Sequence, residues 1–287
     1  MTFNVIDTVT EAVERLTTSA AAVLIAALTV VGVLQTAALQ DILRGFLEWT
    51  VELLNDPEVS AELTASELET AEEQINAYIS ELPLALGLSP GAAALLWLVG
   101  FVVALVVVAV AIDTFGTERD GLEGIPTEGV GRKTLHLLLG WIAFGVLFAI
   151  GFALLIVPGL VVAFVLMFFT VAIVIDDESF VGAFGSSYGV VRSNLLGAFA
   201  IGVLGIVAFV ACWFVGLRLT GVLPGVPGAI AADLITAVGQ VFVLALITRA
   251  YVNATADDTT ADGTVDSVGG GSEWAAETES EPRSGTR

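Results

Sequence analysis

The chain has 287 residues, 56% of them hydrophobic, and a mean hydropathy of +0.91. Soluble domains are about 45–50% apolar, and the excess here lies in long runs, which excludes a soluble globular protein. The net charge of −21 excludes nucleic acid as a partner, because its binding needs basic patches. Such acidity with a single lysine is typical of a halophilic archaeal protein, since salt at about 1 M screens charge within about 3 Å.

Residues 1–18 have the pattern of an amphipathic helix that lies in the membrane interface. Its apolar residues recur at helical spacing and are Phe3, Ile6, Val9, Val13 and Leu16.

The long apolar runs predict an all-α fold, an integral membrane bundle of six transmembrane helices. A run of roughly 20 apolar residues spans the hydrocarbon of a bilayer. The predicted spans are residues 19–39, 91–112, 134–157, 160–175, 195–217 and 228–252. We therefore expect residues 19–252 to form one membrane domain with the lipid bilayer as its solvent.

Residues 45–90, between the first two spans, are predicted to form a helical acidic loop with ten acidic residues and no basic one. An amphipathic stretch leads into the loop, and its apolar face consists of Ile42, Phe46, Trp49 and Leu53. Asp56 is placed to cap a helix that opens at Pro57, and Ser66 begins a capping-box match that ends at Glu69. Ser89-Pro90 is placed to cap the second span.

The apolar stretch of residues 134–175 is too long for one span. A single helix of this length would measure about 63 Å, whereas the hydrocarbon layer is about 30 Å thick. Pro158-Gly159 lies near its middle and predicts a turn between two antiparallel spans. The last segment, residues 253–287, has no periodicity and is predicted to be a disordered acidic tail.

Lys and Arg near the span ends predict the orientation. With both termini cytoplasmic, the inner side holds Arg15, Arg119, Arg132, Lys133, Arg192 and Arg249, and the outer side holds Arg44 and Arg218. We therefore expect a multi-pass protein of the cell membrane whose acidic loop is extracellular.

The candidate site is a polar face on the sixth span. Asp233, Thr236 and Gln240 lie at positions i, i+3 and i+7 and so share one side of a helix. Gln35 on the first span is a weaker candidate of the same kind. These groups would line an ion or substrate path, or they would form hydrogen bonds between helices, with Asp233 able to pair with Arg218.

Other reactive groups are sparse, and the sequence predicts no catalytic, cofactor-binding or metal-binding residue. Asp176-Asp177-Glu178 would bind a divalent cation or, as we favour, cap a helix that starts near Ser179. His136, the only histidine, would be a general base or, as we favour, an interfacial anchor. The Gly185–Gly189 match to G-x-S-x-G lies between two spans rather than in an α/β sheet.

A stretch from about Leu135 to Phe199 carries Val157-Pro158-Gly159, Phe164, Phe168 and Phe169, Ile175 to Ser179, Ala183, Ser186 and Val191 to Asn194. It resembles the membrane domain fused to some glycerophosphodiester phosphodiesterases, and small haloarchaeal membrane proteins of unknown function. The resemblance transfers no catalytic residue and implies an interfacial helix over residues 177–193.

The sequence favours a non-catalytic membrane protein, not an enzyme, that acts through the bilayer, self-association or protein partners. Small residues that let helices approach closely support this reading. The alternative is a small-solute or ion transporter or channel that uses the polar face of the sixth span. A membrane enzyme would need clustered carboxylates at a cavity, for which Asp113 and Asp176–Glu178 are the only candidates.

Overall fold

The computed structural model describes residues 4–60, 64–117 and 129–263, and all regular structure in these ranges is helical. Among these residues, six helical segments are long and apolar enough to cross a membrane. They are α2 (Ser19–Leu54), α5 (Pro90–Gly116), α6 (Val130–Leu154), the pair α7 (Ile156–Val165) and α8 (Phe169–Ile175), α10 (Leu195–Val222) and α11 (Val226–Gly263). The chain is an all-α, multi-pass membrane protein, as its apolar runs predict.

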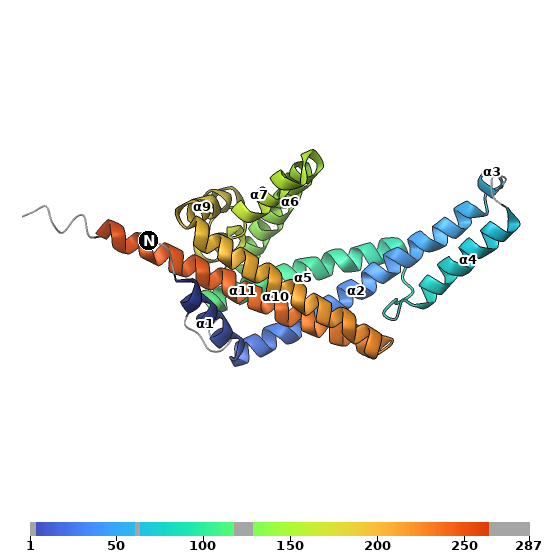
Figure 1. The fold of residues 1–287 in the computed structure, drawn as a ribbon, viewed down its shortest axis with the longest axis horizontal. Helices are drawn as coiled ribbons and strands as arrows, with labels where there is room; N and C mark the ends of the chain where they lie inside the picture. Colours follow the sequence, from blue (N-terminus) through green and yellow to red (C-terminus); the bar gives the residue numbers. More distant parts are fainter. Residues whose placement is uncertain (1–3, 61–63, 118–128, 264–287) are drawn as a thin grey trace, which may run out of the picture.

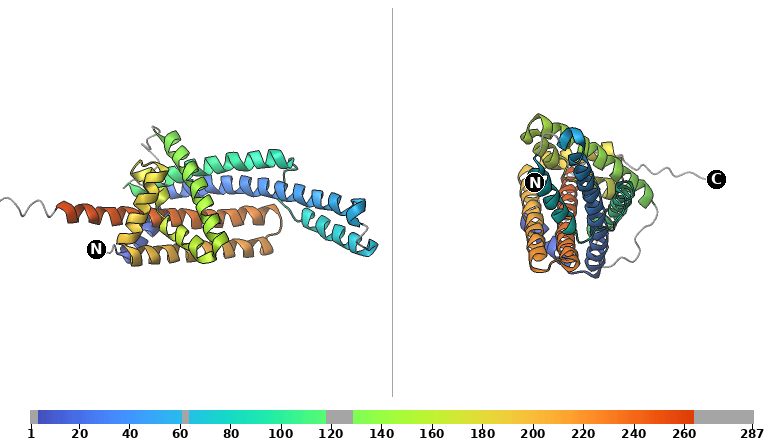
Figure 2. Two further views of the ribbon diagram at one scale, coloured as in Figure 1. Left: turned by 90° about the horizontal axis from the view of Figure 1, so that it is seen from above. Right: turned by 90° about the vertical axis from the view of Figure 1, so that its right-hand side faces the viewer.

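Four of these helices, α2, α5, α10 and α11, run side by side along the long axis of the molecule (Figures 1 and 2). At one end, called the α9 end, lie α1 (Val5–Leu16) and α9 (Phe180–Ser193). Beyond the other end, called the α4 end, lie α3 (Pro57–Ser60) and α4 (Ala65–Ser80). α6 and α7 form a hairpin that crosses the four helices at a tilt (Figure 2).

α2 is one helix of 36 residues, about 54 Å long. The helix continues past residue 39, where the first span is predicted to end, and through the predicted amphipathic stretch, because neither proline nor a break in hydrogen bonding interrupts the chain before Asn55. Its last part continues past the bundle and packs beside α4 (Figure 1). We call residues 42–54 of α2 together with α3 and α4 the projecting hairpin.

α11 also continues past its predicted end at residue 252, so the prediction of disorder from residue 253 is wrong up to Gly263. Asn253 donates a hydrogen bond to Thr8 Oγ1 at 3.2 Å, and Ala254 is 2% exposed. These contacts support the helix where its apolar periodicity has ended. The remainder of the predicted tail lies outside the described residues.

Side-chain caps set where several helices begin. Ser89 Oγ accepts from the amide of Ala92 at 3.4 Å, as predicted for the start of α5. Asp56 Oδ1 accepts from the amide of Glu58 at 2.9 Å, also as predicted, at the start of α3. The capping box of α4 joins Thr64 to Glu67 rather than beginning at Ser66, because α4 starts earlier than the motif implies.

The reversal between α6 and α7 occurs at the extended residue Leu155, so the predicted turn at Pro158-Gly159 is displaced. Pro158 lies in the first turn of α7, where a helix needs no amide donor. Gly159 serves close packing, since a Cβ there would lie 3.0 Å from the backbone nitrogen of Phe152.

The predicted helix over residues 160–175 is interrupted between Val165 and Phe169, where α7 ends and α8 begins. The hydroxyl of Ser187 on α9 donates to the carbonyl of Val165 at 2.8 Å and accepts from the amide of Phe168 at 3.1 Å. This fully buried serine satisfies backbone groups that the break leaves open. α8 itself is central to the core, with its residues from Phe169 to Val174 all buried.

α1 is helical as predicted, and Val9 and Leu16 of its predicted apolar face pack against the core, but the face that is held is shifted. Thr8 and Ala12 are fully buried, while Ile6 and Val13 are 74% and 48% exposed. The short side chains let α1 lie close to α11, and Thr8 also donates to the carbonyl of Asn4 at 3.0 Å. Ile6 and Val13 are left on the outer surface, where lipid would suit them.

Candidate functional sites

The predicted polar face of α11 contacts α2 through one residue, Asp233. Its Oδ1 accepts a hydrogen bond from Thr36 Oγ1 at 3.2 Å. Gly32 of α2 lies next to it, since a Cβ there would be in ordinary van der Waals contact with the carboxylate at 3.8 Å. The predicted partner Arg218 is exposed on α10 and does not bind this carboxylate. Asp233 Oδ2 is buried without a hydrogen-bond partner among the described residues.

The other predicted site residues do not gather around Asp233. Thr236 donates to the carbonyl of Ala232 in its own helix at 2.9 Å. Gln240 is exposed on the surface of α11. Gln35 packs on α5, since a Cβ at Gly100 would lie 3.1 Å from its Cγ. The structure thus places an interhelical hydrogen bond at Asp233, and the four residues do not surround a common space.

The three consecutive carboxylates after α8 bind three different helices. Asp176 accepts from the hydroxyl of Tyr251 on α11, and Asp177 pairs with Arg132 on α6. Glu178 accepts from Ser186 Oγ on α9 at 2.8 and 2.9 Å.

The prediction that this run caps α9 is wrong, because the cap is Ser179, which accepts from the amide of Gly182 at 3.2 Å. Asp177 has a φ of 56°, a left-handed conformation that Asp tolerates better than most residues. This bend separates the directions of the three carboxylates, so the run acts as a junction between α6, α9 and α11.

Further ion pairs and hydrogen bonds continue this polar layer across the α9 end. Arg249 Nε lies 2.7 Å from Glu11 Oε2 and joins α11 to α1. Lys133 Nζ donates to the carbonyl of Val174 at the end of α8 at 2.7 Å. Because these charged groups bind one another, the geometry gives them structural roles.

The remaining candidate residues are not arranged as a catalytic or metal-binding group. Ser186 and Ser187 of the G-x-S-x-G match are engaged by Glu178 and by the α7–α8 break. His136 is part-buried and its Nδ1 has no hydrogen-bond partner in the described part of the chain. Within that part, no group of His, Cys, Asp and Glu side chains is placed to hold a metal ion.

A site that sequence reasoning missed lies where α2 leaves the bundle. Asp41, 1% exposed, accepts from the amides of Leu86 at 3.1 Å and Gly87 at 2.9 Å. Its neighbour Gln40 accepts from the amide of Leu84 at 2.7 Å. We call Gln40 and Asp41 with these amides the clamp. It fixes the chain between α4 and α5 to α2, and so fixes the direction of the projecting hairpin.

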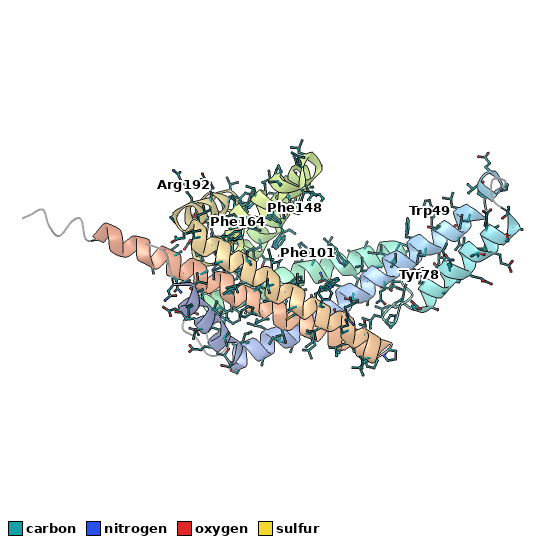
Figure 3. The ribbon with its side chains drawn as sticks, in the orientation of Figure 1. Trp49, Tyr78, Phe101, Phe148, Phe164 and Arg192 are labelled. Atoms are coloured by element: carbon teal, nitrogen blue, oxygen red, sulfur yellow. The ribbon has the colours of Figure 1, made fainter. Side chains whose placement is uncertain are left out.

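Beyond the clamp, α2 carries large apolar side chains on its surface. Leu43, Phe46, Trp49 and Leu53 are 43%, 57%, 54% and 43% exposed. We call these four residues the outer stripe. The rings of Phe46 and Trp49 lie 5.8 Å apart. Figure 3 labels Trp49 on α2 and Tyr78 on α4, the second helix of the hairpin. Contiguous exposed apolar surface of this kind marks an interaction site where it lies in water rather than in lipid.

Comparison with known protein families identifies one family model that matches the chain. The model of a domain of unknown function, DUF7847, matches residues 3–256. The chain belongs to the DUF7847 family. This DUF7847 region covers all six candidate spans and ends at Ala256, the last residue of the sixth candidate span, Val226–Ala256, within α11. No curated protein and no solved structure matches the chain. The resemblance to phosphodiesterase-associated membrane domains stays a prediction.

Proposed function

We propose that this DUF7847 protein is a non-catalytic membrane protein that presents the projecting hairpin as a docking arm for another protein. The observation that carries the proposal is the clamp. The carboxylate of Asp41, which is 1% exposed, accepts hydrogen bonds from two backbone amides in the chain that leads from α4 to α5. Such a bond orients an arm that has few contacts with the rest of the bundle.

The composition of the arm supports the same function. No residue of α4 is buried, so the hairpin has no core of its own, and the outer stripe remains exposed. In water this surface is unfavourable by about 25 cal/mol for each Å² of apolar area. A protein that covered the stripe would recover that free energy.

We further propose that the α9 end and both termini are cytoplasmic and that the hairpin is extracellular, in the cell membrane. The positive-inside rule supports this orientation. Arg132, Lys133 and Arg249 lie in the polar layer of the α9 end, whereas Arg44 lies near the clamp.

The docking function is tested by photo-crosslinking in membranes of the source organism. A photoreactive amino acid at Trp49 should give a discrete adduct of higher mass on irradiation. The matched control is the same substitution at Tyr78, which is 65% exposed on α4 and outside the outer stripe. Equal adducts at the two positions, or none at Trp49, would contradict the function.

A transporter is the second candidate, and the unpaired Oδ2 of Asp233 favours it. The exposure of Gln240 and the separate environments of Thr236 and Gln35 argue against a continuous path. We expect liposomes with the wild-type protein and with Asp233→Ala to show the same ion and solute flux as empty liposomes. A wild-type flux that Asp233→Ala abolishes would reverse this preference.

A further inference from the structure

The outer stripe continues the face of α2 that the bundle buries. Leu24, Leu28 and Val31 are 3%, 6% and 7% exposed. Counting on by three or four residues leads through Gln35, which packs on α5, and Ile42 to Phe46 and Trp49. The same side of the helix is therefore covered by α5 and α11 within the bundle and uncovered past their ends.

Two contacts show where α5 and α11 stop covering this side of α2. A Cβ at Gly45 would overlap Cγ of Pro90, the first residue of α5. α11 begins at Val226, and its residue Asp233 is level with Thr36 of α2. Phe46, Trp49 and Leu53 thus lie beyond both helices. A helix that packed there would extend an interface that already exists.

The occupant is not supplied by the described parts of this chain. The C-terminal ends of α5 and α11, near which the described ranges stop at Thr117 and Gly263, lie toward the α9 end, away from the stripe (Figure 1). A second copy would bring a hairpin of the same sign of charge, since residues 45–90 hold ten acidic residues and no basic one. The nearest base, Arg44, is bound to Glu48 at 2.8 Å.

We propose that the outer stripe seats an amphipathic helix of a partner protein, with an apolar face against Phe46 and Trp49 and with Lys and Arg on its flanks. This inference rests on the docking function and adds the chemistry of the partner. Apolar contact with an aromatic anchor supplies affinity. Ion pairs in direct contact, which act within the roughly 3 Å that salt at about 1 M leaves unscreened, supply specificity.

Binding is measured with the full-length protein in phosphatidylcholine nanodiscs, and empty nanodiscs are subtracted. The probe is a synthetic 18-residue amphipathic helix with Leu on one face and Lys on the other. A second peptide carries Glu in place of each Lys. We expect the Lys peptide to bind and to weaken as salt is raised, and the Glu peptide to bind at least about tenfold more weakly.

Trp49→Ser should weaken binding of the Lys peptide about tenfold, while Tyr78→Ser should change it less than about twofold. Both side chains are exposed, so the two variants should keep the wild-type melting temperature. Equal affinity for the Lys and Glu peptides, or equal effects of the substitutions at Trp49 and Tyr78, would overturn the proposal that the stripe binds a basic amphipathic helix. If the crosslink at Trp49 still formed, the docking function would stand. A crosslinked adduct of twice the chain mass would identify a second copy and overturn the partner proposed here.

Discussion

Asp41 and its two amide donors give a prediction at the scale of single residues. Asp41→Ala leaves the amides of Leu86 and Gly87 without an acceptor, and a buried unpaired donor costs about 1–3 kcal/mol. Hydrogen exchange at these amides should become about 30-fold faster, the equivalent of about 2 kcal/mol. Glu52→Ala, an exposed carboxylate on the same helix, is the control. Unchanged exchange in Asp41→Ala would show that the clamp does not hold the loop.

Ser187 gives a second residue-scale prediction. Ser187→Ala removes both the donor to Val165 and the acceptor for Phe168 at the break in the fourth span. We expect the free energy of unfolding in detergent to fall by about 1–3 kcal/mol. Ser186→Ala, whose part-buried hydroxyl binds the side chain of Glu178, should have a smaller effect because it leaves no backbone group unpaired. Equal melting temperatures for wild type and Ser187→Ala would contradict the role of Ser187.

The sequence could indicate some of these residues and not others. Asp233 stands out because a carboxylate inside an apolar run is rare, and its contact with α2 is of the kind predicted. Asp41 follows the predicted end of the first span and resembles a solvated residue. Its partners lie 45 and 46 positions away, and they are backbone amides, which leave no signal in the pattern of side chains.

At the scale of helices, hydropathy predicts that a span exists but not where its helix ends. α2 and α11 both continue into polar sequence, because α4 packs beside the last part of α2 and Thr8 of α1 accepts a hydrogen bond from Asn253 of α11. The break between α7 and α8 has no proline or glycine at residues 166–168. It depends on Ser187, so only the tertiary contact reveals it.

The junction at Asp176 is tested by Tyr251→Phe. Tyr251 is 1% exposed and donates to Asp176, which links α11 to the end of α8. Loss of the hydroxyl leaves the carboxylate without this donor, and we expect a loss of about 1–3 kcal/mol in stability. Tyr188→Phe, on the exposed side of α9, should leave the melting temperature unchanged. Equal stability of Tyr251→Phe and Tyr188→Phe would contradict the role of Asp176 in joining α11 to the end of α8.

α4 should respond to acid through its capping box. The amide and hydroxyl of Thr64 donate to Glu67 at 2.9 and 2.7 Å, and these bonds lower the pKa of Glu67 from its ordinary 4.5. The folded helix therefore favours the charged carboxylate. Its stabilisation is complete above pH 4.5 and is lost as the pH falls through the lowered pKa.

Hydrogen exchange in the first turn of α4 should accordingly rise in acid, after correction for the intrinsic pH dependence of exchange. Glu67→Gln cannot ionise and should not show this additional rise. The same acid response in both proteins would assign the effect to another group.

At the scale of the whole molecule, the prediction of a six-span membrane bundle is confirmed by six candidate spans in the described residues. What composition could not predict is the shape of the α4 end. A segment with ten acidic residues between two spans is equally compatible with a solvated loop and with a rigid arm. The clamp and the length of α2 show that the segment is an arm with a fixed direction. Both features belong to the folded chain and leave no pattern in its composition.

The orientation of the bundle is tested most directly by labelling single cysteines. In a Cys212→Ser background, one cysteine replaces Glu69 on α4 and another replaces Arg192 on α9, both exposed positions. We predict that a membrane-impermeant maleimide labels position 69 in intact cells and labels position 192 only after the membrane is opened. Labelling of both positions from the same side would contradict a bundle that crosses the membrane and holds its hairpin outside.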